Sequence, residues 1–152
     1  MRTTPSKDTV TGKAMAVPMT LKIALPRIPG IELVALQGLE HLARHLGIAP
    51  DKVGEARIIV TEAIINAFEH GGPETTDVRV EFTMTAEELT IFVRDSGRGF
   101  DPKTMVERPS VTAKGLPSRR GWGMKLMRSL SDGFEISSGT KGTTITITKR
   151  LS

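Results

Sequence analysis

The chain has 152 residues, of which 38% are hydrophobic, 25% charged and only 4% aromatic, which is typical of one globular domain with an aliphatic core. The absence of cysteine excludes a disulfide framework and a thiolate metal site. The net charge of +4 is small and the basic residues are not interleaved with aromatic ones, so we expect no direct nucleic-acid binding. We also expect a cytoplasmic protein with no membrane contact, because the sequence has no apolar leader and no apolar run of membrane-spanning length.

The first half of the chain predicts one strand and two helices. Residues 1–19 are rich in Thr, Ser, Lys and Pro and predict a flexible tail before a domain spanning 20–152. The stretch "TLKIAL" alternates as a strand does, and regularly spaced leucines predict a helix over 31–46 that ends at Gly47. The next helix is expected to begin near Asp51, which could cap it, and to stop at the glycines 71–72.

The second half predicts two hairpins on either side of a long loop and a short helix. "VRVEFTM" (78–84) and "ELTIFVRD" (88–95) read as one hairpin, and "GFEISS" and "GTTITITKRL" as another. Between them, 96–123 lacks periodicity and is typical of a lid or of disorder, and "WGMKLMRSLSD" predicts a helix. The order predicts an α/β fold, a two-layer α/β sandwich with helices on one face of a mixed, mostly antiparallel sheet.

The second predicted helix carries a narrow polar strip on an otherwise apolar surface. The strip consists of Glu55, Glu62, Asn66, Glu69 and His70. The strip could be an ordinary solvated face of the helix. A solvated face usually carries good helix formers, however, and Asn is a poor one. Glu62 and Asn66 are four residues apart, so their side chains would point the same way. In the alternative interpretation, both side chains face one ligand cavity. There the amide oxygen could hold Mg²⁺ and the carboxylate could accept a proton from a nucleophile.

The strand that ends at Asp95 runs directly into the glycine-rich stretch "SGRGFDP". A carboxylate beside Gly97 and Gly99 offers hydrogen-bond acceptors next to a backbone that a ligand can approach closely. An exocyclic amino group would suit this site. The other interpretation is a glycine-rich turn stabilised by an aspartate.

A second glycine cluster, "RRGWGMKLM", places Arg119, Arg120, Gly121 and Gly123 just before a predicted helix start. Backbone N–H groups at a helix N-terminus attract anions, and glycine allows phosphates to come near. Lys114 adds positive charge to the same region. Any one of these cations could equally be a solvated lid charge.

In this order, "EAIINAFEHG", "DSGRGFDP" and "RGWGMKLMRSLSD", followed by "GTTITI", resemble the N, G1 and G2 boxes of the gyrase and histidine-kinase ATPase superfamily, the Bergerat fold. The short length and the motifs "FDP" and "GWGMKLMRSLSD" most closely resemble those of the anti-sigma-factor serine kinases of bacterial partner-switching systems. The resemblance covers residues 20–150. It implies that Glu62 is the general base and Asn66 the Mg²⁺ ligand.

The resemblance also assigns the rest of an ATP site. Asp95 would bind the adenine amino group, in a pocket shaped by Gly97 and Gly99, with Thr144 near the base. The phosphates would lie against the second glycine cluster, under a lid formed by 101–120. The residues implied for the phosphates are Gly121, Gly123, Lys114, Arg119 and Arg120.

The function implied is that of an ATP-dependent protein serine/threonine kinase that acts as an anti-sigma factor. Such a homodimer would hold a sigma factor in one state and phosphorylate a small anti-sigma antagonist in another. A nucleotide-responsive binding module, which sequesters a regulatory partner with little or no phosphotransfer, would use the same pocket. The catalytic half of a histidine kinase is a third interpretation, but the sequence predicts neither a dimerisation hairpin nor a phosphoacceptor helix.

Overall fold

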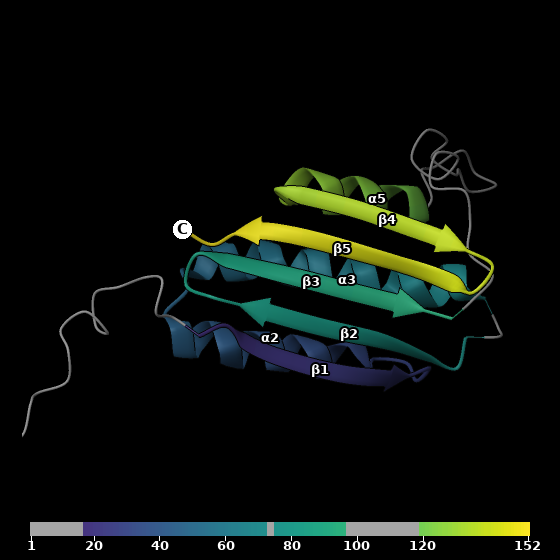
Figure 1. The fold of residues 1–152 in the computed structure, drawn as a ribbon, viewed down its shortest axis with the longest axis horizontal. Coiled ribbons are helices and arrows are strands. Elements are labelled where there is room, and N and C mark those ends of the chain that lie inside the picture. Colours follow the sequence, from purple (N-terminus) through teal and green to yellow (C-terminus); the bar gives the residue numbers. More distant parts are fainter. Residues whose placement is uncertain (1–16, 73–74, 97–118) are drawn as a thin grey trace, which may run out of the picture.

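The computed structural model in Figure 1 describes residues 17–72, 75–96 and 119–152, and of residues 119 and 120 only the backbone. These ranges contain five strands and three helices, which follow one another as strand, two helices, hairpin, helix and hairpin. Their bounds are β1 Met19–Pro26, α2 Glu32–Leu46, α3 Pro50–Gly71, β2 Asp77–Met84, β3 Glu88–Asp95, α5 Arg119–Leu130, β4 Gly133–Gly139 and β5 Gly142–Arg150.

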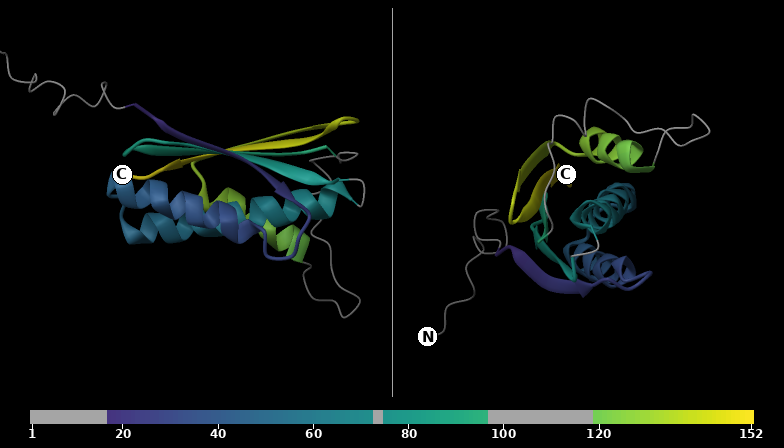
Figure 2. Two further views of the ribbon diagram at one scale, coloured as in Figure 1. Left: turned by 90° about the horizontal axis from the view of Figure 1, so that it is seen from below. Right: turned by 90° about the vertical axis from the view of Figure 1, so that its right-hand side faces the viewer.

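The five strands form one sheet in the order β1-β2-β3-β5-β4. All four neighbouring pairs are antiparallel, so the sheet predicted as mixed and mostly antiparallel has no parallel pair among the described strands. The helices α2, α3 and α5 all lie on one face of the sheet, and no described helix covers the other face, which we call the uncovered face (Figure 2). The predicted two-layer α/β sandwich is therefore confirmed.

The core lies between the sheet and the helix layer. On β2 and β3 every second side chain is buried, as expected when one face of a sheet packs on helices. The helix α3, at 22 residues, carries core side chains along most of its length. The largest fully buried side chains are Phe82, Leu25, Leu39, Ile59, Ile64, Met84, Leu89, Ile91, Met124, Met127, Ile145 and Ile147. The helix α3 is thus anchored by its apolar sides.

The helix ends agree with the predicted stops but not with the predicted cap. Gly47 ends α2 in the left-handed conformation, and its N–H bonds to the last turn. At the start of α3 the capping position is Ala49, Pro50 is the first helical residue, and no side chain caps the helix. The predicted cap Asp51 lies inside the first turn, because proline is favoured at the first helical position.

None of the helices in the described ranges is long and apolar enough to cross a bilayer.

Candidate active site

The carboxyl-terminal half of α3 carries a buried amide. Asn66 is only 5% exposed, and its Oδ1 accepts no hydrogen bond from any described residue. Leaving a buried acceptor unpaired costs about 1–3 kcal/mol. An oxygen held in this way suits a hard cation, for which amide oxygens are ordinary ligands.

One turn earlier on α3, Glu62 lies directly against α5. A Cβ built on Gly123 would overlap Glu62 Oε2 and come within 3.4 Å of Glu62 Cδ. Gly123 is buried, so this contact lies inside the packing of α5 on α3. The N and G2 stretches, far apart in sequence, therefore meet at Glu62 and Gly123, and glycine is needed there to leave room for the carboxylate.

The end of β3 lies at the same end of the molecule as the carboxyl end of α3 (Figure 1). Figure 1 shows the carboxyl ends of α3 and β3 near the point where α5 begins. Asp95 is 3% exposed and pairs across the sheet with Thr143 of β5. Gly142 has a φ of +127°, and a Cβ there would overlap the carbonyl oxygen of Asp95 and lie 3.0 Å from Ser96 Cα. The glycine of the "GTTITI" stretch thus lets β5 close tightly on the backbone that follows Asp95.

The strand register places Thr143, and not the predicted Thr144, opposite Asp95. Thr144 pairs with Arg94, whereas Thr143 pairs with Asp95. Side chains of a strand alternate between its two faces, so Thr144 lies on the uncovered face and Thr143 on the face that carries Asp95. Thr143 is buried, and its hydroxyl lies 2.8 Å from Ser138 Oγ. Thr143 is therefore the threonine beside Asp95.

The other glycine cluster also differs from its prediction. The helix α5 already begins at Arg119, so Arg119, Arg120, Gly121 and Gly123 lie in its first turns and not before its start. The apolar pattern from Trp122 onward suggested a later start, because glycines weaken a helix by propensity alone. Gly97, Gly99 and Lys114 lie outside the described residues, as do the side chains of Arg119 and Arg120.

The polar strip of α3 does not all belong to this site. Near the amino end of α3, Glu55 forms an ion pair with Lys149 of β5, whose side chain is 3% exposed. Lys149 Nζ also donates to the carbonyl oxygen of Leu130 at the end of α5, at 2.8 Å. Lys149 of β5 therefore joins α3 and the end of α5 to the sheet, and Glu55 is its partner on α3. Lys149 was missed because a lysine near the end of a strand normally indicates an exposed residue.

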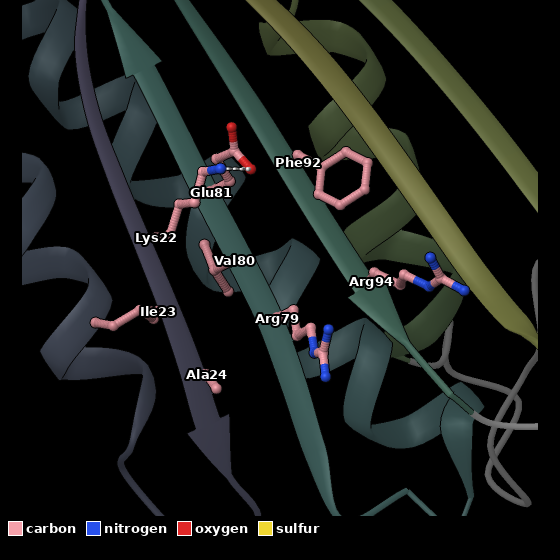
Figure 3. A pocket seen from close by; sticks show the side chains of 8 residues that line it. All are labelled: Lys22, Ile23, Ala24, Arg79, Val80, Glu81, Phe92 and Arg94. Carbon is pink, nitrogen blue, oxygen red and sulfur yellow. Dashed lines mark ion pairs between the residues drawn. The ribbon is translucent and has the colours of Figure 1, made fainter.

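A separate hollow of about 420 Å³ lies on the uncovered face of the sheet (Figure 3). It contains the ion pair between Lys22 and Glu81, at 3.9 Å, and the arginines Arg79 and Arg94, which face each other across β2 and β3. The sheet separates this hollow from the helix layer that carries Asn66. It is not part of the candidate active site.

An antiparallel sheet backed by helices on one face defines an α/β domain. Its candidate site combines a buried amide oxygen that has no partner among the described residues with a carboxylate where α3 and α5 meet. The family described as "Histidine kinase-like ATPase domain" matches residues 31–149. The chain belongs to this family. The superfamily predicted from the N, G1 and G2 boxes is therefore confirmed.

Curated relatives within this superfamily are similar to the chain over most of its length. The anti-sigma F factor of Bacillus velezensis is 34% identical over 105 residues, which cover 67% of this chain and 72% of the relative. The serine-protein kinase RsbW of Bacillus pumilus is 32% identical over 136 residues, covering 84% of this chain and 82% of the relative. The predicted likeness to anti-sigma-factor serine kinases is confirmed by these relatives.

Among solved structures, the RsbU and RsbW domains of a Mycobacterium tuberculosis protein match with a TM-score of 0.63. The match has 20% sequence identity and covers 88% of this chain and 32% of that chain. At this identity the likeness shows the shared fold.

Proposed function

We propose that this chain is an ATP-dependent protein serine/threonine kinase that also acts as an anti-sigma factor. In this proposal it works in the cytoplasm as a homodimer, binds a sigma factor in one state and phosphorylates a small anti-sigma antagonist in another. The names of its relatives, an anti-sigma F factor and a serine-protein kinase, support both activities.

The observation that carries the proposal is that Asn66 and Glu62 lie one turn apart on α3. Asn66 keeps a buried oxygen without a partner among the described residues, and one turn away Glu62 lies against Gly123 of α5. An oxygen that the described residues leave unpaired could hold a metal, and a carboxylate for which Gly123 leaves room could accept the proton of a hydroxyl.

Magnesium fits this site by the chemistry of its donors. No group of three His, Cys, Asp or Glu side chains in the described ranges could hold a metal alone, and Mg²⁺ is usually bound by one or two protein oxygens together with phosphates and water. Asn66 Oδ1 would be the protein ligand. When bound, Mg²⁺ would neutralise charge on the triphosphate.

The adenine end of ATP is assigned to the end of β3. We propose that Asp95 accepts a hydrogen bond from the adenine amino group, in a pocket shaped by Gly97 and Gly99. The register favours Thr143 in place of Thr144 as the hydroxyl near the base. For the phosphates we propose the start of α5 with Gly121 and Gly123, aided by the cations Lys114, Arg119 and Arg120.

In the proposed reaction a serine or threonine hydroxyl of the antagonist attacks the γ-phosphorus. A new O–P bond forms as the bond between the γ-phosphorus and the β–γ bridging oxygen breaks, and ADP leaves. Glu62 accepts the hydroxyl proton, so the attacking oxygen carries no positive charge into the product. The chain's main contribution is to position these groups and to exclude water from them.

The variant Glu62→Gln tests the proposal with the purified full chain, Mg-ATP and a small anti-sigma antagonist from the same organism. The amide keeps the shape of the side chain against Gly123 but cannot accept the proton. We expect phosphotransfer, measured by intact mass, to fall by about 100-fold or more. ADP affinity, measured by calorimetry, should stay within about twofold, because the removed group acts on the hydroxyl.

The outcomes separate the candidate functions. Normal phosphotransfer by Glu62→Gln would contradict the role of Glu62. A wild-type chain that binds nucleotide and partner but transfers no phosphate would instead be a nucleotide-responsive binding module. If no heat is detected with Mg-ADP or Mg-ATP, the nucleotide site itself is refuted.

A further inference from the structure

Arg27, the first residue after β1, binds the carboxyl end of α3 at several points. Its Nε donates to the carbonyl oxygen of Thr75 at 3.1 Å, and its Nη2 donates to the carbonyl oxygen of Phe68 at 2.8 Å. The same Nη2 also donates to the carbonyl oxygen of Gly72. The guanidinium lies over the Phe68 ring, 5.2 Å from its centre.

These contacts satisfy groups that the helix cannot satisfy itself. The last four carbonyls of an α-helix have no intrahelical partner, and α3 ends at Gly71, so the Phe68 carbonyl is one of them. Gly72 follows with φ 71° and ψ −173°, a positive-φ conformation that favours glycine and ends the helix. A guanidinium is suited to this place because its planar fork binds several acceptors at once and its charge complements the negative end of the helix.

The segment that Arg27 holds is the one that presents the metal ligand. Phe68 is two residues beyond Asn66, and the direction of the Asn66 side chain is set by the backbone of this last part of α3. Helix ends fray unless they are held by caps or by packing. Arg27 itself is exposed, so its role is not to fill the core.

We infer that Arg27 is a positioning residue for the Mg-nucleotide site. By tying the last turn of α3 to the end of β1, it keeps Asn66 Oδ1 at the place where Mg²⁺ would bind. The inference rests on the proposed function for the metal, while the contacts of Arg27 stand independently of it. It acts only through Asn66, so it should affect the metal-dependent part of nucleotide affinity.

The test compares Arg27→Ala and Arg27→Lys with a control on the same helix. Arg57→Ala removes the ion pair between Arg57 and Glu40, which joins α3 to α2 away from Asn66. For each full-length protein, calorimetry gives the ADP dissociation constant with Mg²⁺ and with EDTA. Hydrogen exchange gives the protection of amides 66–72, and urea unfolding gives global stability.

We expect Arg27→Ala to weaken Mg-ADP binding by about tenfold, the low end of the effect of losing a group that supports a metal ligand. ADP binding in EDTA should change by less than about twofold, since Asn66 then has no metal to hold. Amides 66–72 should exchange faster. Arg27→Lys should fall between the wild type and Arg27→Ala, because it keeps the charge but loses the fork.

An unchanged magnesium effect in Arg27→Ala would overturn the inference, as would an equal loss of that effect in Arg57→Ala. Unchanged exchange of amides 66–72 would also overturn it. A wild-type chain without any Mg-nucleotide binding would refute the proposed function and this role with it, whereas wild-type binding that Arg27→Ala leaves intact would refute this role alone.

Discussion

The two halves of α3 carry the same polar strip but use it in opposite ways. Near the amino end, the carboxylate of Glu55 is paired with the buried cation of Lys149. Near the carboxyl end, Asn66 is 5% exposed, yet its Oδ1 has no partner among the described residues. In one half the chain supplies its own counter-charge, and in the other it leaves an acceptor for something else to bind.

Residue type and spacing on a helix therefore do not distinguish a structural group from a functional one. Both residues lie on the same strip of the same helix. What separates them is the partner that the rest of the fold brings to each. A buried acceptor without a partner lowers stability, and costs of this kind are expected where a ligand will later repay them.

The substitution Asn66→Leu should have the largest effect on nucleotide binding. Leucine has a similar volume and removes the unpaired oxygen, so the free energy of unfolding of the ligand-free protein should stay the same or rise by about 1 kcal/mol. The Mg-ADP dissociation constant should rise roughly 100-fold, since the proposed metal ligand is lost. Urea unfolding and calorimetry measure the two quantities.

Gln37→Leu is the matched control, because Gln37 is an exposed amide on α2. It should leave nucleotide affinity unchanged. If Asn66→Leu destabilised the ligand-free protein strongly, Asn66 would have a structural role like that of Glu55, and the contrast between the two halves would be lost.

The sequence predicted all the described elements because their hydrophobic periods are long and regular. The alternation that ends at Asp95, for example, continues on the buried face of β3 without a break. The same rule, applied from Ile145 and Ile147 backwards, would have placed Thr143 and not Thr144 on the buried face. The sequence alone could therefore have favoured Thr143 as the threonine beside Asp95.

Other features could not be read from the sequence. The partner of Glu55 is 94 residues away, and no local pattern indicates that Lys149 is buried. Arg27 follows "LP" and precedes "IPG", a stretch that indicates only a break between elements. Its contacts with Phe68 and Gly72 depend on how β1 and α3 are placed by the sheet. Such long-range pairings are decided by tertiary packing.

Gly123→Ala should have a smaller effect on binding but a clear one on catalysis. The added Cβ would overlap Glu62 Oε2, the end of a flexible side chain, so Glu62 should move while the fold stays intact. Alanine is also the better helix former, so the free energy of unfolding should stay the same or rise by up to about 1 kcal/mol. Phosphotransfer should fall by about 100-fold, because small misplacements of a reacting group are costly.

Gly54→Ala provides the control for this change, since a Cβ at Gly54, also on a helix, would have nothing within 4 Å. It should stabilise the protein by about 0.5–1 kcal/mol and leave phosphotransfer unchanged. Equal phosphotransfer by Gly123→Ala and Gly54→Ala would show that the contact between Glu62 and Gly123 does not matter for the reaction.

The change Lys149→Met should have the smallest effect on nucleotide binding and a marked effect on stability. It leaves the Glu55 carboxylate and the Leu130 carbonyl without their shared donor. Breaking a fully buried pair costs about 3–5 kcal/mol, and we expect about 2 kcal/mol here because the Glu55 side chain is 37% exposed and water can reach it. Adding Glu55→Leu should restore part of this loss, since an apolar pair can replace an ionic one.

Urea unfolding measures both changes in stability. The Mg-ADP affinity of Lys149→Met should stay within about twofold of the wild type, because the chain itself supplies the partner of Glu55 in this half of α3. A large loss of Mg-ADP affinity in Lys149→Met would mean that the two halves of the helix are coupled and that the carboxyl end depends on the ion pair at the other.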